Sequence, residues 1–183
     1  MMLKNTVAVY GVIAKFFHWF MAALIIGMFM LAYTMINIPA SHFSDRLYSL
    51  HKATGLFLFG LVILRLLWRF INIEPKLPRS VPLWQRQLAK LNIIALYLLM
   101  LAMPLTGFLM STFGNHIISF YGIFTVSPLA DNPLVSNFFA KAHQILSYLL
   151  IAAFTLHVIG AFYHPVLQRM WVFPKKRVME NNK

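Results

Sequence analysis

The segment FHWFMAALIIGMFMLAYTM, residues 17–35, is almost entirely apolar and carries one histidine, His18, near its start. About 20 consecutive apolar residues are enough for a helix to cross a bilayer, so this segment is long enough to span. A second apolar segment, AKAHQILSYLLIAAFTLHVIG at residues 140–160, carries His143 and His157. Ionisable side chains are rare within membrane spans, and they indicate a functional site there.

The composition places the whole chain in the membrane class. It is 60% hydrophobic and 11% charged, whereas about a quarter of the residues of a soluble domain are charged. The chain has no cysteine, which excludes disulfides, thiolate zinc sites, iron–sulfur clusters, cysteine nucleophiles and covalently attached c-type haem.

Four segments are long and apolar enough to span, at about residues 15–36, 50–70, 90–113 and 140–164. We therefore predict an all-α fold, a four-helix transmembrane bundle that forms a single integral membrane domain over residues 1–183. Within the second span the charge-free stretch covers only residues 53–64, between Lys52 and Arg65, whose long side chains can reach the head groups. The first segment lacks a cleavage site and is predicted to be an uncleaved span.

The connections between the spans are predicted to be loops. Pro75, Pro78 and Pro82 interrupt helix propagation before the third span. The long connection after the third span is mildly apolar and is predicted to lie along the membrane surface. All four acidic residues are expected in loops or the tail: Asp45, Glu74, Asp131 and Glu180. Of the seven histidines, His42 and His116 are expected in loops and His164 at a helix end.

The basic residues predict the orientation of the bundle. Only Arg46, Lys52 and Lys141 fall on one side of the membrane, and the other thirteen of the sixteen lysines and arginines fall on the opposite side. Basic residues gather on the cytoplasmic side, so both termini are predicted to be cytoplasmic. Topology and contact with anionic membrane lipid account for the net charge of +12, and no nucleic acid partner is expected.

The remaining four histidines sort into two pairs. His143 and His157 are fourteen residues apart, so they share one helix face about 21 Å apart along the axis. With alternating helix directions, His18 lies level with His157 near the cytoplasmic surface, and His51 lies level with His143 near the outer surface. Facing side chains on neighbouring helices are how bundles build cofactor sites.

Two imidazoles without an inward carboxylate suit haem, which supplies four nitrogens of its own and needs only axial ligands. A tetrahedral zinc site needs more donors. We therefore predict two haem b groups, with metal ligands His18 and His157 for one and His51 and His143 for the other. The alternatives are that a single histidine hydrogen-bonds across helices or lines a cavity, and that the chain is a haem-free channel or transporter.

Two glycines are candidates for contact with the macrocycle. Gly55, one turn from His51, would let a flat porphyrin lie against the backbone, although it also suits ordinary close packing of helices. Gly107 in the third span is a weaker candidate, and Pro104 beside it is expected to be a tolerated kink.

Basic residues are candidates for the haem propionates. Arg65 lies fourteen residues after His51 on the same face, and Arg65 or Arg69 can pair with carboxylates at the inner site. Lys52 and Lys141 flank the outer ligands, where they can bind propionates or attract a small anion. Interfacial anchoring is the simpler alternative for these side chains.

The chain resembles the bacterial cytochrome b561 family of four-helix diheme membrane cytochromes over nearly its whole length. The matching pieces are YGVIAKFFHW at 10–19, LHKATG at 50–55, LRLLWR at 64–69, LYLLMLAMPLTGFLMS at 96–111 and AHQILSYLLIAAFTLHVIGAFYH at 142–164. The resemblance implies that His18, His51, His143 and His157 are the axial ligands of haem b. It also implies a location in the bacterial cytoplasmic membrane and electron transfer coupled to quinone.

Members that resemble superoxide oxidases pass an electron from superoxide to ubiquinone, and more distant ones are haem subunits of hydrogenases. We therefore expect a quinone-linked oxidoreductase with superoxide as a candidate donor. The alternative is a haem-bearing membrane anchor that passes electrons for a partner dehydrogenase or hydrogenase, with that enzyme as its redox partner protein. Saturated iron ligation argues against oxygen binding, and the sequence assigns no catalytic residue and no quinone site.

Overall fold

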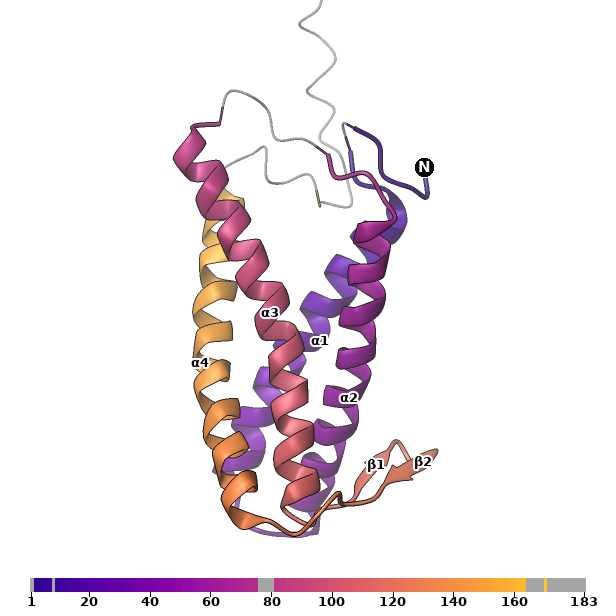
Figure 1. Ribbon diagram of the computed structural model, residues 1–183, viewed down its shortest axis with the longest axis vertical. Coiled ribbons are helices and arrows are strands. Elements are labelled where there is room, and N and C mark those ends of the chain that lie inside the picture. The colour runs from indigo at the N-terminus through magenta and orange to yellow at the C-terminus, as the bar shows by residue number, and fades with distance from the viewer. Residues whose placement is uncertain (1, 8, 76–80, 164–169, 171–183) are drawn as a thin grey trace, which may run out of the picture.

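The computed structural model describes residues 2–7, 9–75, 81–163 and 170. These residues form four long helices, α1 (Val12–Asn37), α2 (His42–Phe70), α3 (Leu83–Phe113) and α4 (Pro133–Tyr163). All four are long and apolar enough to cross a membrane, and they run up and down in one bundle (Figure 1). The predicted four-helix transmembrane bundle is confirmed. We call the end at which α1 begins the N-terminal end, and the opposite end, which carries residues 114–132, the hairpin end.

All four helices begin earlier than the predicted spans, α1 by three residues and the other three by seven or eight. α2 begins at His42 rather than near residue 50, α3 at Leu83 rather than 90, and α4 at Pro133 rather than 140. The apolar stretch marks the part of a helix that contacts lipid, and the helices continue beyond it into polar flanks. The prediction that His42 and Asp45 lie in a loop is therefore wrong, because both belong to the first turn of α2.

A capping box explains where α2 begins. Ser41 is the N-cap: its Oγ accepts a hydrogen bond from the Ser44 N–H at 3.2 Å, and the Ser44 Oγ accepts one from the Ser41 N–H at 2.9 Å. These bonds satisfy backbone donors that have no partner within the helix. Asp45 in the first turn adds a negative charge where the helix dipole favours one.

The connection at the hairpin end contains two short antiparallel strands, β1 (Ile118–Phe120) and β2 (Phe124–Val126). The turn between them has positive φ angles at Tyr121 (49°) and Gly122 (77°), the second of which suits glycine. The hairpin packs against α2: the Thr54 Oγ1 and the Tyr121 hydroxyl lie 2.9 Å apart, and Ile118 is buried. The sequence analysis predicted no strands in this segment.

The helices do not pack equally with one another. α3 and α4 lie close along much of their length, where the Ser136 Oγ donates to the Met110 carbonyl at 2.8 Å and the rings of Phe113 and Phe139 stack. α1 packs on α2, and α2 on α3, whereas the backbone of α4 approaches those of α1 and α2 at few points. The helices that carry the predicted ligand pairs are therefore not in direct backbone packing.

Few side chains in the described part of the chain are fully buried against protein. The buried hydrophobic side chains among the described residues are Met21, Ala53, Leu58, Val62, Val81, Ile118, Leu150 and Ala153. Most large apolar side chains point outward, where a bilayer would cover them. The bundle therefore has an apolar surface and a thin protein core.

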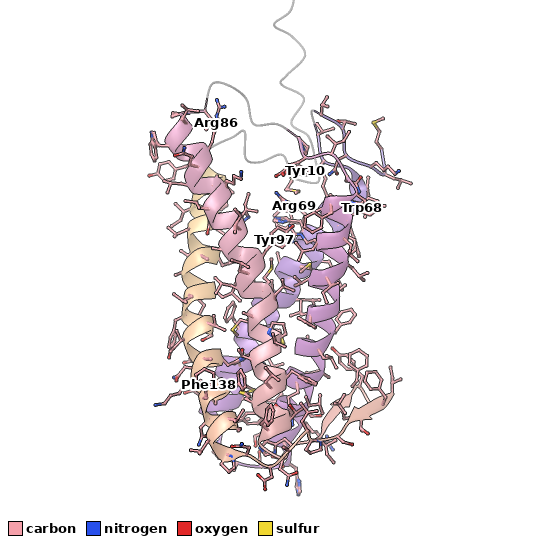
Figure 2. All side chains as sticks on the ribbon, viewed as in Figure 1. Tyr10, Trp68, Arg69, Arg86, Tyr97 and Phe138 are labelled. Atoms are coloured by element: carbon pink, nitrogen blue, oxygen red, sulfur yellow. The ribbon has the colours of Figure 1, made fainter. Side chains whose placement is uncertain are left out.

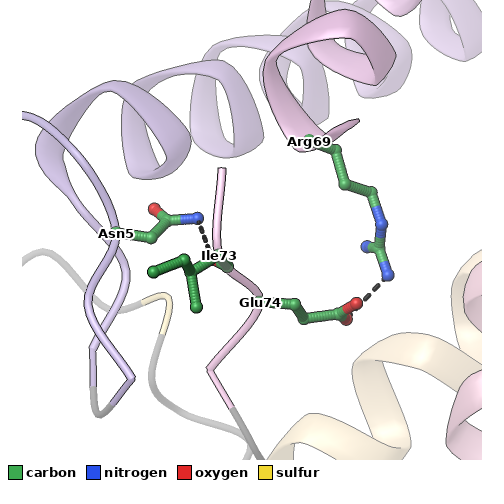
Figure 3. A network of polar contacts seen from close by, with 4 residues as sticks. All are labelled: Asn5, Arg69, Ile73 and Glu74. Atoms are coloured by element: carbon green, nitrogen blue, oxygen red, sulfur yellow. Dashed lines mark hydrogen bonds and ion pairs between the residues drawn. The ribbon is translucent and has the colours of Figure 1, made fainter. Parts of the chain in front are cut away.

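Polar contacts join the connections at the N-terminal end (Figure 3). The Asn5 Nδ2 donates to the Ile73 carbonyl at 2.9 Å, and the Arg69 Nη2 donates to the Glu74 Oε1 at 2.6 Å. Pro82 is the N-cap of α3, in agreement with the predicted interruption before that span. Pro78, His164 and the C-terminal basic tail lie outside the described residues.

The capping box predicts a test of the start of α2. Ser41→Ala removes the acceptor for the Ser44 N–H and should lower the free energy of unfolding by about 1 kcal/mol, seen as a fall of a few degrees in Tm in detergent. Ser41→Asp keeps an acceptor and should unfold close to the unchanged protein. Equal Tm values for both variants and the parent would contradict this role of Ser41.

Candidate functional site

Two pairs of histidine rings face each other across the bundle. His18 of α1 and His157 of α4 lie near the N-terminal end with ring centroids 5.9 Å apart. His51 of α2 and His143 of α4 lie near the hairpin end with centroids 6.3 Å apart. The structure thus brings together the two pairs that the sequence analysis grouped by level.

These separations fit one metal held between two imidazoles. A metal lies about 2.0 Å from a ligating ring nitrogen and that nitrogen about 1.1 Å from the ring centroid, so rings on opposite sides of one metal have centroids about 6.2 Å apart. The separations of 5.9 and 6.3 Å are close to this value. Each pair has the spacing of two axial ligands.

The pairs carry too few donors to hold a metal ion alone. Within the described residues, no group of three or more histidine, aspartate or glutamate side chains gathers closely enough to bind a metal. A metal at either pair would therefore need donors besides these side chains. Haem, with its four pyrrole nitrogens, fits this donor set.

The His143 ring is held in the orientation that a ligand needs. Its Nδ1 lies 2.9 Å from the Met103 carbonyl, an acceptor only, so Nδ1 carries the hydrogen and donates it. The Thr106 Oγ1 lies 3.1 Å from the same nitrogen. This leaves the lone pair on Nε2, and a backbone carbonyl is a usual outer partner of a metal-bound histidine.

Gly107 lets the His143 ring lie directly against α3. A Cβ at residue 107 would lie 3.0 Å from the His143 Cε1 and 3.3 Å from its Nδ1, closer than side chains normally approach. The expected role of Gly107 was contact with the porphyrin. The structure places the His143 ring there, and contact with a porphyrin stays a prediction.

His51 has a buried nitrogen without a partner. Its Nδ1 is buried and makes no hydrogen bond within the part of the chain that the structure describes. Such an atom costs about 1–3 kcal/mol in lost solvation. A ring that the fold leaves incompletely satisfied suits a position kept for a bound group.

His18 makes a different contact. The Arg65 Nη2 lies 3.1 Å from the His18 Nδ1, and a guanidinium only donates, so this nitrogen accepts and the hydrogen is on Nε2. If Nε2 binds a metal, the ring hydrogen has to be on Nδ1, which can then no longer accept a hydrogen bond from Arg65. Arg65 would have to release His18 in that case, and the guanidinium of Arg65 would become available to a carboxylate.

The two arginines share a contact with one tyrosine of α3. The Cζ atoms of Arg65 and Arg69 lie 5.5 and 5.4 Å from the centroid of the Tyr97 ring. These are cation–π distances, and they hold both guanidinium groups near the His18 and His157 level. Arg69 is also paired with Glu74, whereas Arg65 contacts His18, Met21 and Tyr97.

The other predicted contacts are placed as follows. A Cβ at Gly55 would meet only the Met28 Cε, at 3.9 Å, so close helix packing does not explain this glycine. The Lys52 Nζ donates to the Ile117 carbonyl at 3.3 Å, which ties it to the hairpin connection. Lys141 is exposed on α4 at the hairpin end, on the side of the bundle where the sequence analysis put it.

Sequence reasoning missed three residues that contact the histidines or the arginines. Met103 and Thr106 bind His143, and Tyr97 stacks with both arginines. The order PLTG at 104–107 places a threonine and a glycine next to a proline within a span, which was a usable signal. Nothing local to Tyr97 separates it from the other aromatic residues of the chain.

Comparison with known proteins gives two kinds of match. A family model described as prokaryotic cytochrome b561 matches residues 9–174. Cytochrome b561 homolog 2 of Escherichia coli (strain K12) is 33% identical over 175 residues, which cover 92% of this chain and 91% of that relative. Cytochrome b561 homolog 1 of the same organism is 31% identical over 123 residues, or 65% of this chain and 68% of its own length. These matches imply b-type haem as the cofactor and electron transfer in a membrane.

The contact at residue 107 predicts a selective effect on one site. Gly107→Ala should push the His143 ring off its carbonyl and change the reduced-minus-oxidised haem spectrum, because about 3.0 Å is too close for a Cβ. Gly60→Ala is the control, since nothing lies within 4 Å of a Cβ there. Identical spectra and haem contents for both variants would show that Gly107 does not position His143.

Proposed function

Since the chain belongs to the prokaryotic cytochrome b561 family, we propose that it is a diheme b-type cytochrome that carries electrons across the cytoplasmic membrane. His18 and His157 are the axial ligands of one haem, and His51 and His143 are those of the other. The observation that carries this proposal is the pair of facing imidazoles at each of two levels, with centroids 5.9 and 6.3 Å apart. Along α4 the two levels are about 21 Å apart.

The chain's part in the chemistry is to hold and orient the haem groups and to shield them from water. When bound, haem b supplies an iron that accepts and releases one electron at a time. Two histidines would hold each haem, and the iron would then have no open position at which oxygen could bind. The apolar helices keep water from the interior. Electrons then pass from a donor and to an acceptor without a bond between either molecule and the iron.

Three further residues are proposed to contact the haems. Arg65, once it releases His18, pairs with a propionate at the N-terminal end. Lys52 at the hairpin end does the same or attracts an anionic donor. Gly55 gives a porphyrin access to the backbone of α2, which is supported by its loose surroundings: among the described residues, a Cβ there would meet the flexible end of Met28 at 3.9 Å.

The proposed reaction is quinone-linked oxidation of a small donor, with superoxide as the candidate. The N-terminal end is cytoplasmic and the hairpin end faces outward, as the distribution of basic residues predicts. Electrons enter at the His51 and His143 level and leave at the His18 and His157 level. Lys52 and Lys141 are the basic side chains beside the outer histidines that an approaching anion would meet, and Arg46 adds a third positive charge at the same end.

The four ligands predict a spectroscopic result. Alanine at His51 or His143, and separately at His18 or His157, should each lower the haem-to-protein ratio from about two to about one, because a haem with one axial ligand is released more easily. The two groups of variants should lose different components of the reduced-minus-oxidised spectrum. His116→Ala in the hairpin connection is the control and should retain both. Loss of the same component in all four variants would rule out two separate sites.

The outer lysines predict a kinetic result. Lys52→Gln together with Lys141→Gln should slow superoxide oxidation by about threefold at low salt and weaken its salt dependence, because less positive charge attracts the anion. Lys15→Gln with Lys90→Gln removes the same charge at the other end and should leave the rate unchanged. Haem content is measured in both. Equal rates in the two double variants would refute the steering role.

The same assay separates the proposed enzyme from the membrane anchor. A purified chain that reduces quinone with superoxide acts alone, as proposed here. A chain that contains haem but reduces quinone only with a partner dehydrogenase or hydrogenase is an anchor.

A further inference from the structure

A groove lies between α2 and α3 near the N-terminal end, with a volume of about 250 Å³. Two of its lining side chains, Arg69 and Tyr97, carry polar groups. The others are purely apolar: Leu66, Phe70, Ile93, Ile94, Leu98 and Leu101. The groove is thus an apolar slot with polar groups at one place.

The polar groups lie together. Figure 2 shows Arg69 and Tyr97 beside each other between α2 and α3, and the Arg69 Cζ lies 5.4 Å from the Tyr97 ring centroid. A guanidinium has five N–H donors, and the phenol adds one O–H. The side chains can therefore donate hydrogen bonds to a ligand in the groove.

The charge of Arg69, the arginine that lines the groove, is offset by a carboxylate. Arg69 is already paired with Glu74, whose Oε1 lies 2.6 Å from the Arg69 Nη2. The carboxylate offsets the guanidinium charge, so a phosphate head group gains little from this arginine. A neutral molecule with carbonyl acceptors still gains from the guanidinium N–H groups that Glu74 does not use.

The groove opens where lipid would lie. Phe70 is 80% exposed and Leu98 is 63% exposed, and both are on spans that a bilayer would surround. A ligand can therefore enter from the hydrocarbon region. A long apolar tail on the ligand would remain in the lipid.

The groove also adjoins one of the histidine pairs. Arg65 touches both: its Cζ lies 5.5 Å from the Tyr97 ring centroid and its Nη2 lies 3.1 Å from the His18 Nδ1. Arg65 thus links the tyrosine of the groove to the histidine. A redox-active ligand in the groove would lie close to the proposed inner haem.

We propose that this groove binds the head group of a quinone, with the Arg69 guanidinium and the Tyr97 hydroxyl donating to its carbonyl oxygens. A quinone is neutral and planar, has two carbonyl acceptors and carries an apolar tail, which matches the charge, lining and opening of the groove. The inference rests on the proposed quinone-linked function and gives it a site, which the sequence alone did not provide.

The reaction at this site balances as a two-electron reduction. The quinone takes two electrons, supplied one at a time by two molecules of a one-electron donor, and two protons from the water at the N-terminal end. It leaves as quinol, and each donor molecule is oxidised by one electron. Arg69 and Tyr97 bind the quinone oxygens throughout.

The first test fills the groove. Leu98→Trp should raise the KM for decylubiquinone at least tenfold in the purified haem-containing protein, with an unchanged haem spectrum. Leu156→Trp on α4 is the matched control, because Leu156 is also 63% exposed and does not line the groove. Equal KM values for the two variants would overturn the proposal.

The second test removes donors and keeps packing. Tyr97→Phe loses only the hydroxyl and retains the ring under both arginines, and it should raise the KM for decylubiquinone by about tenfold, as expected for one hydrogen bond. Arg69→Gln should do the same. Glu74→Gln breaks the same ion pair, leaves the guanidinium in place and should keep the parent KM. If Glu74→Gln and Arg69→Gln have equal effects, the ion pair and not the guanidinium matters, and the proposal fails.

Photolabelling tests the proposed quinone site separately from the quinone-linked activity. An azidoquinone photolabel should attach to peptides that contain residues 66–70 or 93–101, and excess decylubiquinone should prevent it. Labelling elsewhere, or labelling prevented by phospholipid but not by decylubiquinone, would overturn the site while quinone reduction remained intact. If the parent protein reduces no quinone with any donor or partner, the quinone-linked function itself fails.

Discussion

The structure depends on one constraint, which is that an imidazole within an apolar span needs a partner that lipid cannot provide. α4 carries two such rings, and each faces a ring from another helix at about the distance that a shared metal requires. The backbone of α4 nevertheless packs closely on α3 and approaches α1 and α2 at few points. Directly packed helices have axes about 8–10 Å apart, whereas two histidines joined through a metal would hold their helices farther apart. The uneven packing of the bundle and its thin buried core agree with such an arrangement.

The part of this arrangement that follows from periodicity could be predicted from the sequence. The spans, and the levels at which His18, His51, His143 and His157 lie, depend on apolar length, helix rise and alternating direction. Details that depend on tertiary contacts could not be predicted. The early start of α2 follows from the Ser41 and Ser44 capping box, which lies outside the apolar stretch. The role of Gly107 depends on which ring of α4 lies against it, and the spacing within α3 carries no information about that.

The two ends of the bundle differ in how their basic side chains are used. At the hairpin end, Lys52 donates to the Ile117 carbonyl and Lys141 is exposed, so positive charge is available at the surface. At the N-terminal end, Arg65 and Arg69 are held against the Tyr97 ring, and Arg69 is balanced by Glu74. An exposed charge attracts a small anion from water, whereas a neutralised, partly buried donor suits a neutral molecule that arrives through lipid. This difference agrees with a donor at the hairpin end and a quinone at the N-terminal end.

The histidines of the two pairs are also prepared differently. The Nδ1 of His143 already donates to the Met103 carbonyl, so its Nε2 lone pair is available to a metal without rearrangement. The Nδ1 of His18 accepts from Arg65 and has to lose that contact first. A ligand that donates to a carbonyl is more basic, and greater basicity stabilises the oxidised metal. If all four histidines are ligands, the hydrogen bond from His143 to Met103 therefore lowers the reduction potential of the haem at that pair. The Arg65 guanidinium adds positive charge beside the pair with His18, and this stabilises the reduced metal. These two contacts favour transfer from the hairpin end to the N-terminal end, which is the direction that a quinone at the groove requires, whereas Lys52 adds positive charge at the hairpin end.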